Sequence, residues 1–257
     1  MKLIYFLIGI LMFTSSCRNY YYIPNTPNVS LPEKKGDVEI RVGLSEGVDI
    51  QASYSPANNI GIMFNHNYYE LENDNIGSEI GRTSEIGLGL YGTSTSKFFR
   101  YSIFGGLGKH IYDGRYRSVT NFSDLEANKS FIQLNLGVKG KFMEYALFYR
   151  ISNLHYTKVI YEVDEELNQG DRMYLDTLAT KRDIGYLTVG MMLGFGFEKF
   201  KLQFSGSIKG RTTKMPSMDS SALFPYRLGI LLSYNFNTKD LFKQAKPKRS
   251  NESIWAN

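Results

Sequence analysis

Apolar residues occupy every second position along many stretches of this chain. From Asp37 to Ser45 the apolar residues are valine, isoleucine and leucine, and polar or small residues lie between them. The stretch from Tyr226 to Asn237 repeats the pattern, with Leu231 as the exception. A period of two is typical of a β-strand with one apolar face. We predict about ten such strands, over residues 37–45, 48–55, 59–70, 83–93, 98–112, 129–141, 144–160, 184–197, 200–211 and 226–237.

The lengths of these stretches fit a membrane. A tilted strand needs about 9–11 residues to cross a bilayer, and each predicted strand is near or above that length. No stretch after the N-terminal residues approaches the roughly 20 apolar residues of a transmembrane helix. The 19 tyrosines, 17 phenylalanines and 24 glycines, with only 7 prolines, suit long strands with aromatic girdles. The sequence therefore predicts an all-β fold, an antiparallel up-and-down transmembrane β-barrel.

Charged side chains on the alternate face support a membrane barrel. In such a barrel the apolar face contacts lipid, and the charges lie in a narrow polar lumen where opposite signs can pair. A soluble lipid-anchored β-sandwich or lipocalin-like barrel is the alternative, with the apolar face inside. The charges that we expect to face the lumen are Glu39, Arg41, Asp49, Lys139, Arg150, Lys201 and Arg227.

The predicted connections alternate in length, which also favours a membrane barrel. Long outer loops and short periplasmic turns are typical of these proteins. An even number of strands leaves both ends of the barrel on one side. With a lipid on Cys17 in the inner leaflet, we expect that side, and both termini of the chain, to be periplasmic. The long connections are 71–82, 113–128, 161–183 and 212–225, and the short ones are 94–97, 142–143 and 198–199.

The N-terminal residues resemble an export signal. Met1, Lys2 and an apolar run to Phe13 precede Ser15, Ser16 and the sole cysteine, Cys17. A basic start, an apolar core and small residues before a cut describe a secretory signal peptide. We therefore expect residues 1–16 to be removed and Cys17 to carry lipid. Several acyl chains on one residue anchor a protein stably.

The residues on either side of the predicted barrel, 37–237, have a different composition. Residues 17–36 contain Pro24, Pro27 and Pro32, which exclude a helix or central strand. We interpret 17–36 as an extended, lipid-anchored tether. Residues 238–257 are polar and basic, and Trp255 lies near their end. We expect a disordered periplasmic tail, either simply solvated or in contact with anionic lipid or a partner.

The start of the mature chain resembles a group of Bacteroidota proteins. Thr14-Ser15-Ser16-Cys17 is similar to the relaxed lipobox of that phylum. The stretches 22–29, 33–37 and 51–56 resemble the opening of a group of its uncharacterised outer-membrane β-barrel lipoproteins. The resemblance covers about 45 residues and implies a location and a fold, but no activity. Arg18, rather than aspartate, follows the cysteine, and we expect sorting to the outer membrane.

The sequence offers little catalytic chemistry. A rim-site lipid-modifying enzyme would need a nucleophile, a base and an orienting acid. His110, Ser84 and Glu85 lie near the predicted outer strand ends, but they form no known motif. His66 and His155 fall near strand ends on apolar faces and are not at metal-ligand spacing. We therefore predict no enzymatic activity.

The remaining motifs give no cofactor or metal site. Acidic residues cluster at 70–74 and 162–166, but neither cluster matches a calcium-binding loop. Gly194 and Gly196 fall within a strand, so we expect small lumen-facing residues and not a phosphate loop. The net charge is +5, with pI about 9.0, but the basic residues are scattered in an exported chain, which excludes nucleic acid.

Three functional hypotheses follow. The first is a lipid-anchored structural or interaction component of a cell-envelope complex, whose partners are outer-membrane lipid and other envelope proteins. The alternative is a narrow channel or small-ligand carrier. A lipid-modifying enzyme is the weakest. About ten strands enclose an interior close to the size that side chains fill, which favours the first hypothesis.

Overall fold

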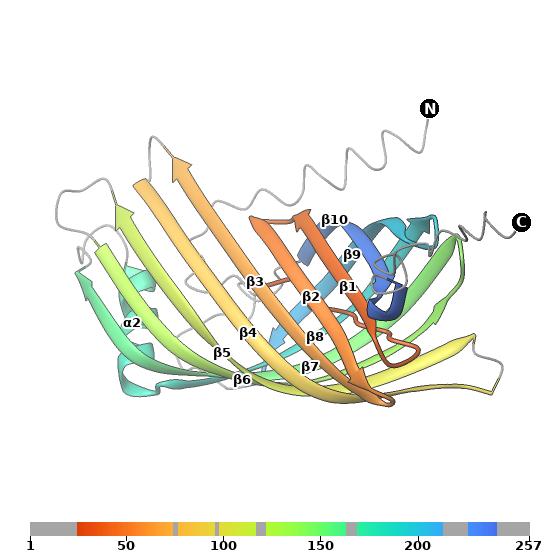
Figure 1. Ribbon diagram of the computed structural model, residues 1–257. Coiled ribbons are helices and arrows are strands. Elements are labelled where there is room, and N and C mark those ends of the chain that lie inside the picture. Colours follow the sequence, from red (N-terminus) through yellow and green to blue (C-terminus); the bar gives the residue numbers. More distant parts are fainter. Residues whose placement is uncertain are drawn as a thin grey trace, which may run out of the picture.

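The chain forms a closed barrel of ten antiparallel strands (Figure 1). The computed structural model describes residues 25–73, 77–95, 98–116, 122–162, 169–212 and 226–240. Strands that are consecutive in the sequence are neighbours in the sheet, and the first strand pairs with the last from Asp37↔Asn237 to Leu44↔Ile230. This arrangement confirms the predicted up-and-down barrel.

The strands differ greatly in length, from 8 to 20 residues. The elements are β1 (Asp37–Leu44), β2 (Val48–Ala57), β3 (Ile60–Asn73), β4 (Gly77–Thr93), β5 (Phe99–Tyr116), β6 (Phe122–Lys139), β7 (Met143–Glu162), α2 (Gln169–Thr180), β8 (Asp183–Gly196), β9 (Phe200–Arg211) and β10 (Tyr226–Asn237).

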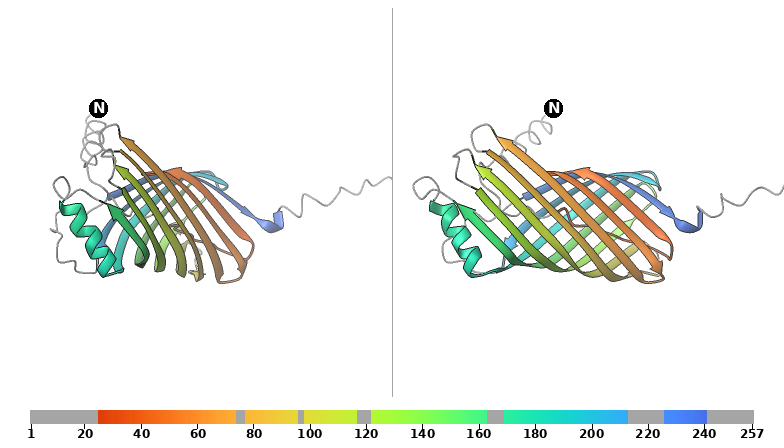
Figure 2. Two further views of the ribbon diagram at one scale, coloured as in Figure 1. Left: turned by 90° about the vertical axis from the view of Figure 1, so that its left-hand side faces the viewer. Right: turned by 60° about the vertical axis from the view of Figure 1, so that its left-hand side comes forward.

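The two ends of the barrel are distinct (Figure 2). At one end, here called the short-turn end, β1 begins and β10 finishes, and the connections are 58–59, 94–98, 140–142 and 197–199. The connections at the opposite, long-loop end are 45–47, 74–76, 117–121, 163–182 and 212–225. Helix α2 lies at the long-loop end.

Two predicted loops are mostly strand, which corrects the sequence interpretation. Much of 71–82 and 113–128 belongs to β3, β4, β5 and β6. Polar outward residues made these stretches look like loops, but the ladders continue there. Cross-strand ion pairs join Lys109 to Glu126 at 2.6 Å and Lys158 to Asp124 at 2.5 Å. Helix α2, within predicted loop 161–183, was not expected either.

An apolar belt covers the outside of the barrel. On β4, Ile86, Leu88 and Leu90 are each about 60% exposed, and similar residues point outward from the other strands. Exposed apolar residues on this scale suit lipid rather than water. The alternative of a soluble barrel is therefore wrong, because it places the apolar face inside. No helix in the described part of the chain is long and apolar enough to cross a membrane.

The belt has recognisable borders. At the short-turn end, Tyr234 packs between Phe200 and Phe236, with ring centroids 4.6 and 5.5 Å apart, as in an aromatic girdle. Towards the long-loop end, outward apolar residues give way to polar ones: on β4 the change falls between Ile86 and Ser84. Strands β3 to β7 continue beyond this border as paired sheet.

Several expectations concern residues outside the described ranges. These are the signal peptide 1–16, the lipid site Cys17 with the tether up to residue 24, and the tail from 241 to 257.

Candidate functional site: the occupied lumen

The lumen of the barrel contains part of its own chain. Residues 25–31, here called the lumen segment, are extended and buried. The segment reaches the lumen through a reversal just before β1, where Gly36 adopts a φ of +87° that glycine tolerates best. The Gly36 amide donates a hydrogen bond to the Ser55 carbonyl at 2.7 Å, and its carbonyl accepts one from the Thr238 amide at 2.9 Å. The sequence interpretation described this stretch only as a tether.

The wall of the lumen binds the main chain of this segment. Five carbonyl groups of the segment accept hydrogen bonds from side chains on β1, β2, β5 and β6. These bonds do not depend on the identity of the segment's side chains. They run from Gln51 to Thr26 (2.8 Å), Gln133 to Asn28 (2.8 Å), Arg41 to Val29 (2.9 Å), Ser102 to Ser30 (2.8 Å) and Arg100 to Leu31 (3.2 Å).

Polar side chains of the segment are also matched to the wall. Thr26 donates from its hydroxyl to Asp49 at 2.8 Å, and its amide donates to the other carboxylate oxygen at 3.3 Å. Asn28 accepts from Arg41 at 2.7 Å and donates to the Ala52 carbonyl at 3.0 Å. A buried amide needs such partners, because an unpaired one costs about 1–3 kcal/mol. The segment is therefore held by specific contacts.

The apolar residues of the segment pack against the far wall. Val29 and Leu31 form a buried cluster with Ala146 and Phe148 of β7 and Met192 of β8. Burial of side chains of this size contributes about 1.5–3 kcal/mol each. The segment thus contacts both sides of the lumen and fills the space between them.

An ionic cluster lies midway along the lumen. The Glu85 carboxylate is 2.5 Å from the Lys129 ammonium and 2.6 Å from the Arg150 guanidinium. Asn25, at the start of the lumen segment, donates to Glu85 at 2.8 Å and accepts from Lys129 at 3.2 Å. The guanidinium of Arg150 also lies 3.9 Å from the centre of the Phe131 ring. The cluster links three strands to the segment.

The structure places all seven predicted lumen charges towards the interior. Six of them are buried, and the side chain of Lys139 is 17% exposed. They lie in several separate ion pairs, which are Glu39–Arg41 (2.8 Å), Glu39–Lys139 (3.8 Å), Asp49–Arg227 (3.2 Å), Glu85–Arg150 (2.6 Å) and Glu144–Lys201 (2.9 Å).

Sequence reasoning missed several partners of these residues. Glu85, Lys129 and Glu144 share the parity of the predicted charges, and the period of two points all three inward. The sequence interpretation named Glu85 only as a catalytic candidate, and it did not include Lys129 or Glu144 among the lumen charges. Across the described residues, buried bases outnumber buried acids. The bases are Arg41, Arg100, Lys129, Arg150, Lys201, Lys209 and Arg227, and the acids are Glu39, Asp49, Glu79, Glu85 and Glu144.

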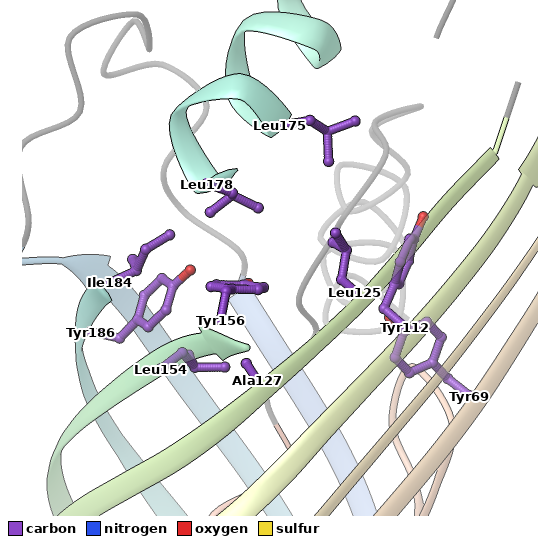
Figure 3. Packing of buried hydrophobic residues seen from close by; sticks show 10 residues of the cluster. All are labelled: Tyr69, Tyr112, Leu125, Ala127, Leu154, Tyr156, Leu175, Leu178, Ile184 and Tyr186. Carbon is purple, nitrogen blue, oxygen red and sulfur yellow. The ribbon is translucent and has the colours of Figure 1, made fainter. Parts of the chain in front are cut away.

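An apolar cluster fills the inside of the barrel towards the long-loop end (Figure 3). Leu175 and Leu178 of α2 face the strand residues of this cluster and are fully buried. Helix α2 therefore docks by its apolar residues. The strand members are Tyr69, Tyr112, Leu125, Ala127, Leu154, Tyr156, Ile184 and Tyr186.

The short-turn end has a small polar cavity. Its volume is about 420 Å³, and charges of both signs line it. Arg100 and Glu33 pair there at 2.8 Å, and Lys139 donates to Asn235 at 2.9 Å.

Glu46 lies at the opposite, long-loop end, in the turn 45–47 between β1 and β2. Partial burial raises the pKa of the Glu46 carboxyl, and the Arg227 guanidinium opposes this shift.

The histidines do not assemble the suggested catalytic group. His110 is buried and its Nδ1 lies 2.9 Å from the hydroxyl of Thr83. Ser84 lies on the opposite face of the sheet, where it contacts His66 at 2.9 Å. Glu85 is engaged in the ionic cluster. The three candidate residues therefore do not form a triad.

Other sequence candidates also have local partners. His155 contacts Asp183 at 3.0 Å on the outside of the barrel, and Glu70 accepts from the Tyr68 hydroxyl at 2.6 Å. Among the residues that the structure describes, no three His, Cys, Asp or Glu side chains are grouped so as to hold a metal ion. Asp74 and residues 163–168 lie outside the described ranges.

Comparison with known proteins adds a distant structural likeness. No family model and no curated protein matches the sequence. One similar solved structure is the N-terminal β-barrel domain of Pseudomonas aeruginosa OprF, which is 11% identical. The match covers 79% of this chain and 99% of that domain, with a TM-score of 0.30. A score this low supports no functional inference.

Proposed function

We propose that this protein is a lipid-anchored outer-membrane β-barrel that serves as a structural or interaction component of a cell-envelope complex. The observation that carries this proposal is the occupied lumen. Residues 25–31 and the apolar cluster take up space that a channel would need. The barrel then contributes a stable membrane anchor and exposed ends, and not a pore.

The projecting strands support a role in interaction. Strands β5, β6 and β7 contain 18, 18 and 20 residues, whereas about 9–11 suffice to cross a bilayer. Their excess length extends beyond the apolar belt at the long-loop end. Ordered, ion-paired sheet outside the membrane is a rigid surface that another envelope protein can contact.

The location is part of the proposal. The apolar belt, the resemblance to Bacteroidota lipoproteins and the signal-like N-terminal residues support an outer-membrane barrel with Cys17 lipidated. The short turns support a periplasmic position for the end of β10. Among the residues that the structure describes, no arrangement of catalytic side chains favours enzymatic activity.

A small-ligand carrier is the second candidate, and the short-turn cavity is the observation in its favour. Ligand pockets are commonly about 300–1,000 Å³ and mostly apolar. This cavity has the size, but its lining is rich in charges, and two pairs among them are already formed, Arg100–Glu33 and Lys139–Glu39. The structural role therefore accounts for more of the lumen than the carrier role does.

Conductance in planar bilayers tests the proposal. We expect the purified wild type to show little or no conductance. Deletion of residues 25–31 should raise the conductance above the wild-type level, because it removes the lumen segment and leaves only the apolar cluster at the long-loop end. Deletion of 241–257 is the control and should leave conductance low. Large, steady openings in the wild type would exclude a closed barrel and favour the channel alternative.

A further inference from the structure

We infer that the chain passes through the barrel, so that Cys17 lies at the long-loop face while the end of β10 lies at the opposite face. This inference rests on the proposed membrane location and goes beyond it, because it assigns the anchor to the outer surface. The lipid on Cys17 would then insert into the outer leaflet beside the projecting strands.

The course of the lumen segment gives the direction. Gly36 lies at the short-turn end, where it bonds to Ser55 and Thr238. Leu31 bonds to Arg100, the second residue of β5 at that end. Asn25 bonds to Glu85, halfway along β4. Traced from Gly36 back to Asn25, the chain therefore climbs steadily towards the long-loop end.

Asn25 has already reached the outer border of the apolar belt. Its partner Glu85 lies between outward-facing Ile86, which is 61% exposed, and Ser84, which is polar. Its other partner, Lys129, lies between two exposed polar residues of β6. Both contacts therefore lie at the level where outward residues change from apolar to polar.

The distance to each leaflet decides between the two possible exits. Cys17 is eight residues before Asn25, and eight extended residues span at most about 26–29 Å. The outer leaflet lies at or near the level of Asn25, well within this reach. The periplasmic leaflet lies about 25 Å away across the belt. To reach it, the eight residues between Cys17 and Asn25 would have to run almost straight and fully extended back towards the short-turn end.

That descent would also meet an occupied lumen. The chain would have to reverse beside residues 25–31, where the side chains of Glu85 and Lys129 are 0% and 2% exposed. A second strand of chain would need its own partners for every buried amide and carbonyl. An upward exit requires no such reversal, although the apolar cluster also occupies the lumen towards the long-loop end.

The inference differs from the expectation based on strand parity. An even strand number places the start of β1 and the end of β10 on one side, and the structure agrees. The even number of strands says nothing about the residues before β1, where the chain reverses direction at Gly36. The pairing of β1 with β10 closes the barrel around the segment.

Labelling of introduced cysteines tests the inference in intact cells. Asn19→Cys, with Cys17 retained for lipidation, should react with a membrane-impermeant maleimide. The matched variant Lys239→Cys, just after β10, should react only after the outer membrane is permeabilised. We expect at least a tenfold difference in labelling of the two variants before permeabilisation. Equal protection of both would overturn the inference.

An engineered disulfide tests the position of the segment separately. A Cβ atom added at Gly229 would lie 3.5 Å from Oγ1 of Thr26, close enough for a bond between Thr26→Cys and Gly229→Cys. We expect this disulfide in the assembled protein. Its absence from assembled barrels would overturn the lumen position. If it forms while Asn19→Cys is protected, the exit is wrong but the closed barrel, and hence low conductance, still stands.

Discussion

The guanidinium of Arg41 on β1 donates a hydrogen bond of 2.9 Å to the main-chain carbonyl of Val29 in the lumen segment. Arg41 also donates to Asn28 at 2.7 Å and pairs with Glu39 at 2.8 Å. One buried side chain therefore joins the segment to the first strand of the wall.

Replacement of Arg41 should destabilise the barrel. Arg41→Met keeps much of the side-chain volume but removes the bonds to the segment and leaves Glu39 short of its closest cation. Breaking a buried pair from one side typically costs about 3–5 kcal/mol. Urea titrations in lipid vesicles measure the free energy of unfolding. Arg115→Met, whose side chain is 60% exposed, is the control and should change it by less than about 0.5 kcal/mol. Equal effects would contradict a role for Arg41 inside the lumen.

Glu85 and Arg150 should be energetically coupled. Their atoms lie 2.6 Å apart in the middle of the lumen, with both side chains nearly inaccessible. In a double-mutant cycle with Glu85→Gln and Arg150→Met, we expect a coupling energy of about 0.5–3 kcal/mol. The same urea titrations supply the four unfolding free energies. Additive effects would mean that water screens the pair in the lumen.

Arginine on the apolar belt should be costly. Ile230 is 53% exposed on the outward face of β10, and Ile230→Arg should cost about 2–4 kcal/mol in vesicles. Ile160→Arg is the matched control, because Ile160 is 48% exposed on the outward face but lies near the long-loop end of β7, beyond the belt. It should cost about 0–1 kcal/mol. The opposite order would mean that the outward face does not meet lipid as proposed.

The long-loop end should face the cell exterior. Ala179 at the end of α2 and Lys141 in a short turn are both exposed and lie at opposite ends of the barrel. Ala179→Cys should react with an impermeant maleimide on intact cells, whereas Lys141→Cys should react only after permeabilisation. Reversed accessibility of the two cysteines would mean that the barrel has the opposite orientation in the membrane.

Lipidation should depend on Cys17. Metabolic labelling with a palmitate analogue should mark the wild type and should not mark Cys17→Ala. The variant should still form a barrel, because the ten strands that close it run from Asp37 to Asn237, and heat-modified migration on gels checks this. Equal labelling of both proteins would exclude Cys17 as the lipid site.

The barrel itself could be predicted because its signal is local. Alternation along β1 or β10 is a property of adjacent residues, since successive side chains of a strand point to opposite faces. The same parity placed Arg41, Arg150 and Lys201 on the inner face without any knowledge of their partners. Strand ends were less certain, because polar outward residues such as Glu126 occur both in loops and in paired sheet beyond the lipid.

The sequence by itself therefore determined the strands, their faces and the membrane-compatible fold. Only the tertiary structure decided what the lumen holds. Asn25 contacts Lys129 across 104 residues of sequence, and Arg41, Gln51 and Gln133 meet one segment only after the sheet closes. Their excess of hydrogen-bond donors is satisfied by main-chain carbonyls, which every residue carries. Main-chain carbonyls carry no sequence signal, and the side-chain partners of Thr26 and Asn28 come from strands that assemble only in the closed sheet. The position of residues 25–31 is therefore decided by closure and not by local sequence.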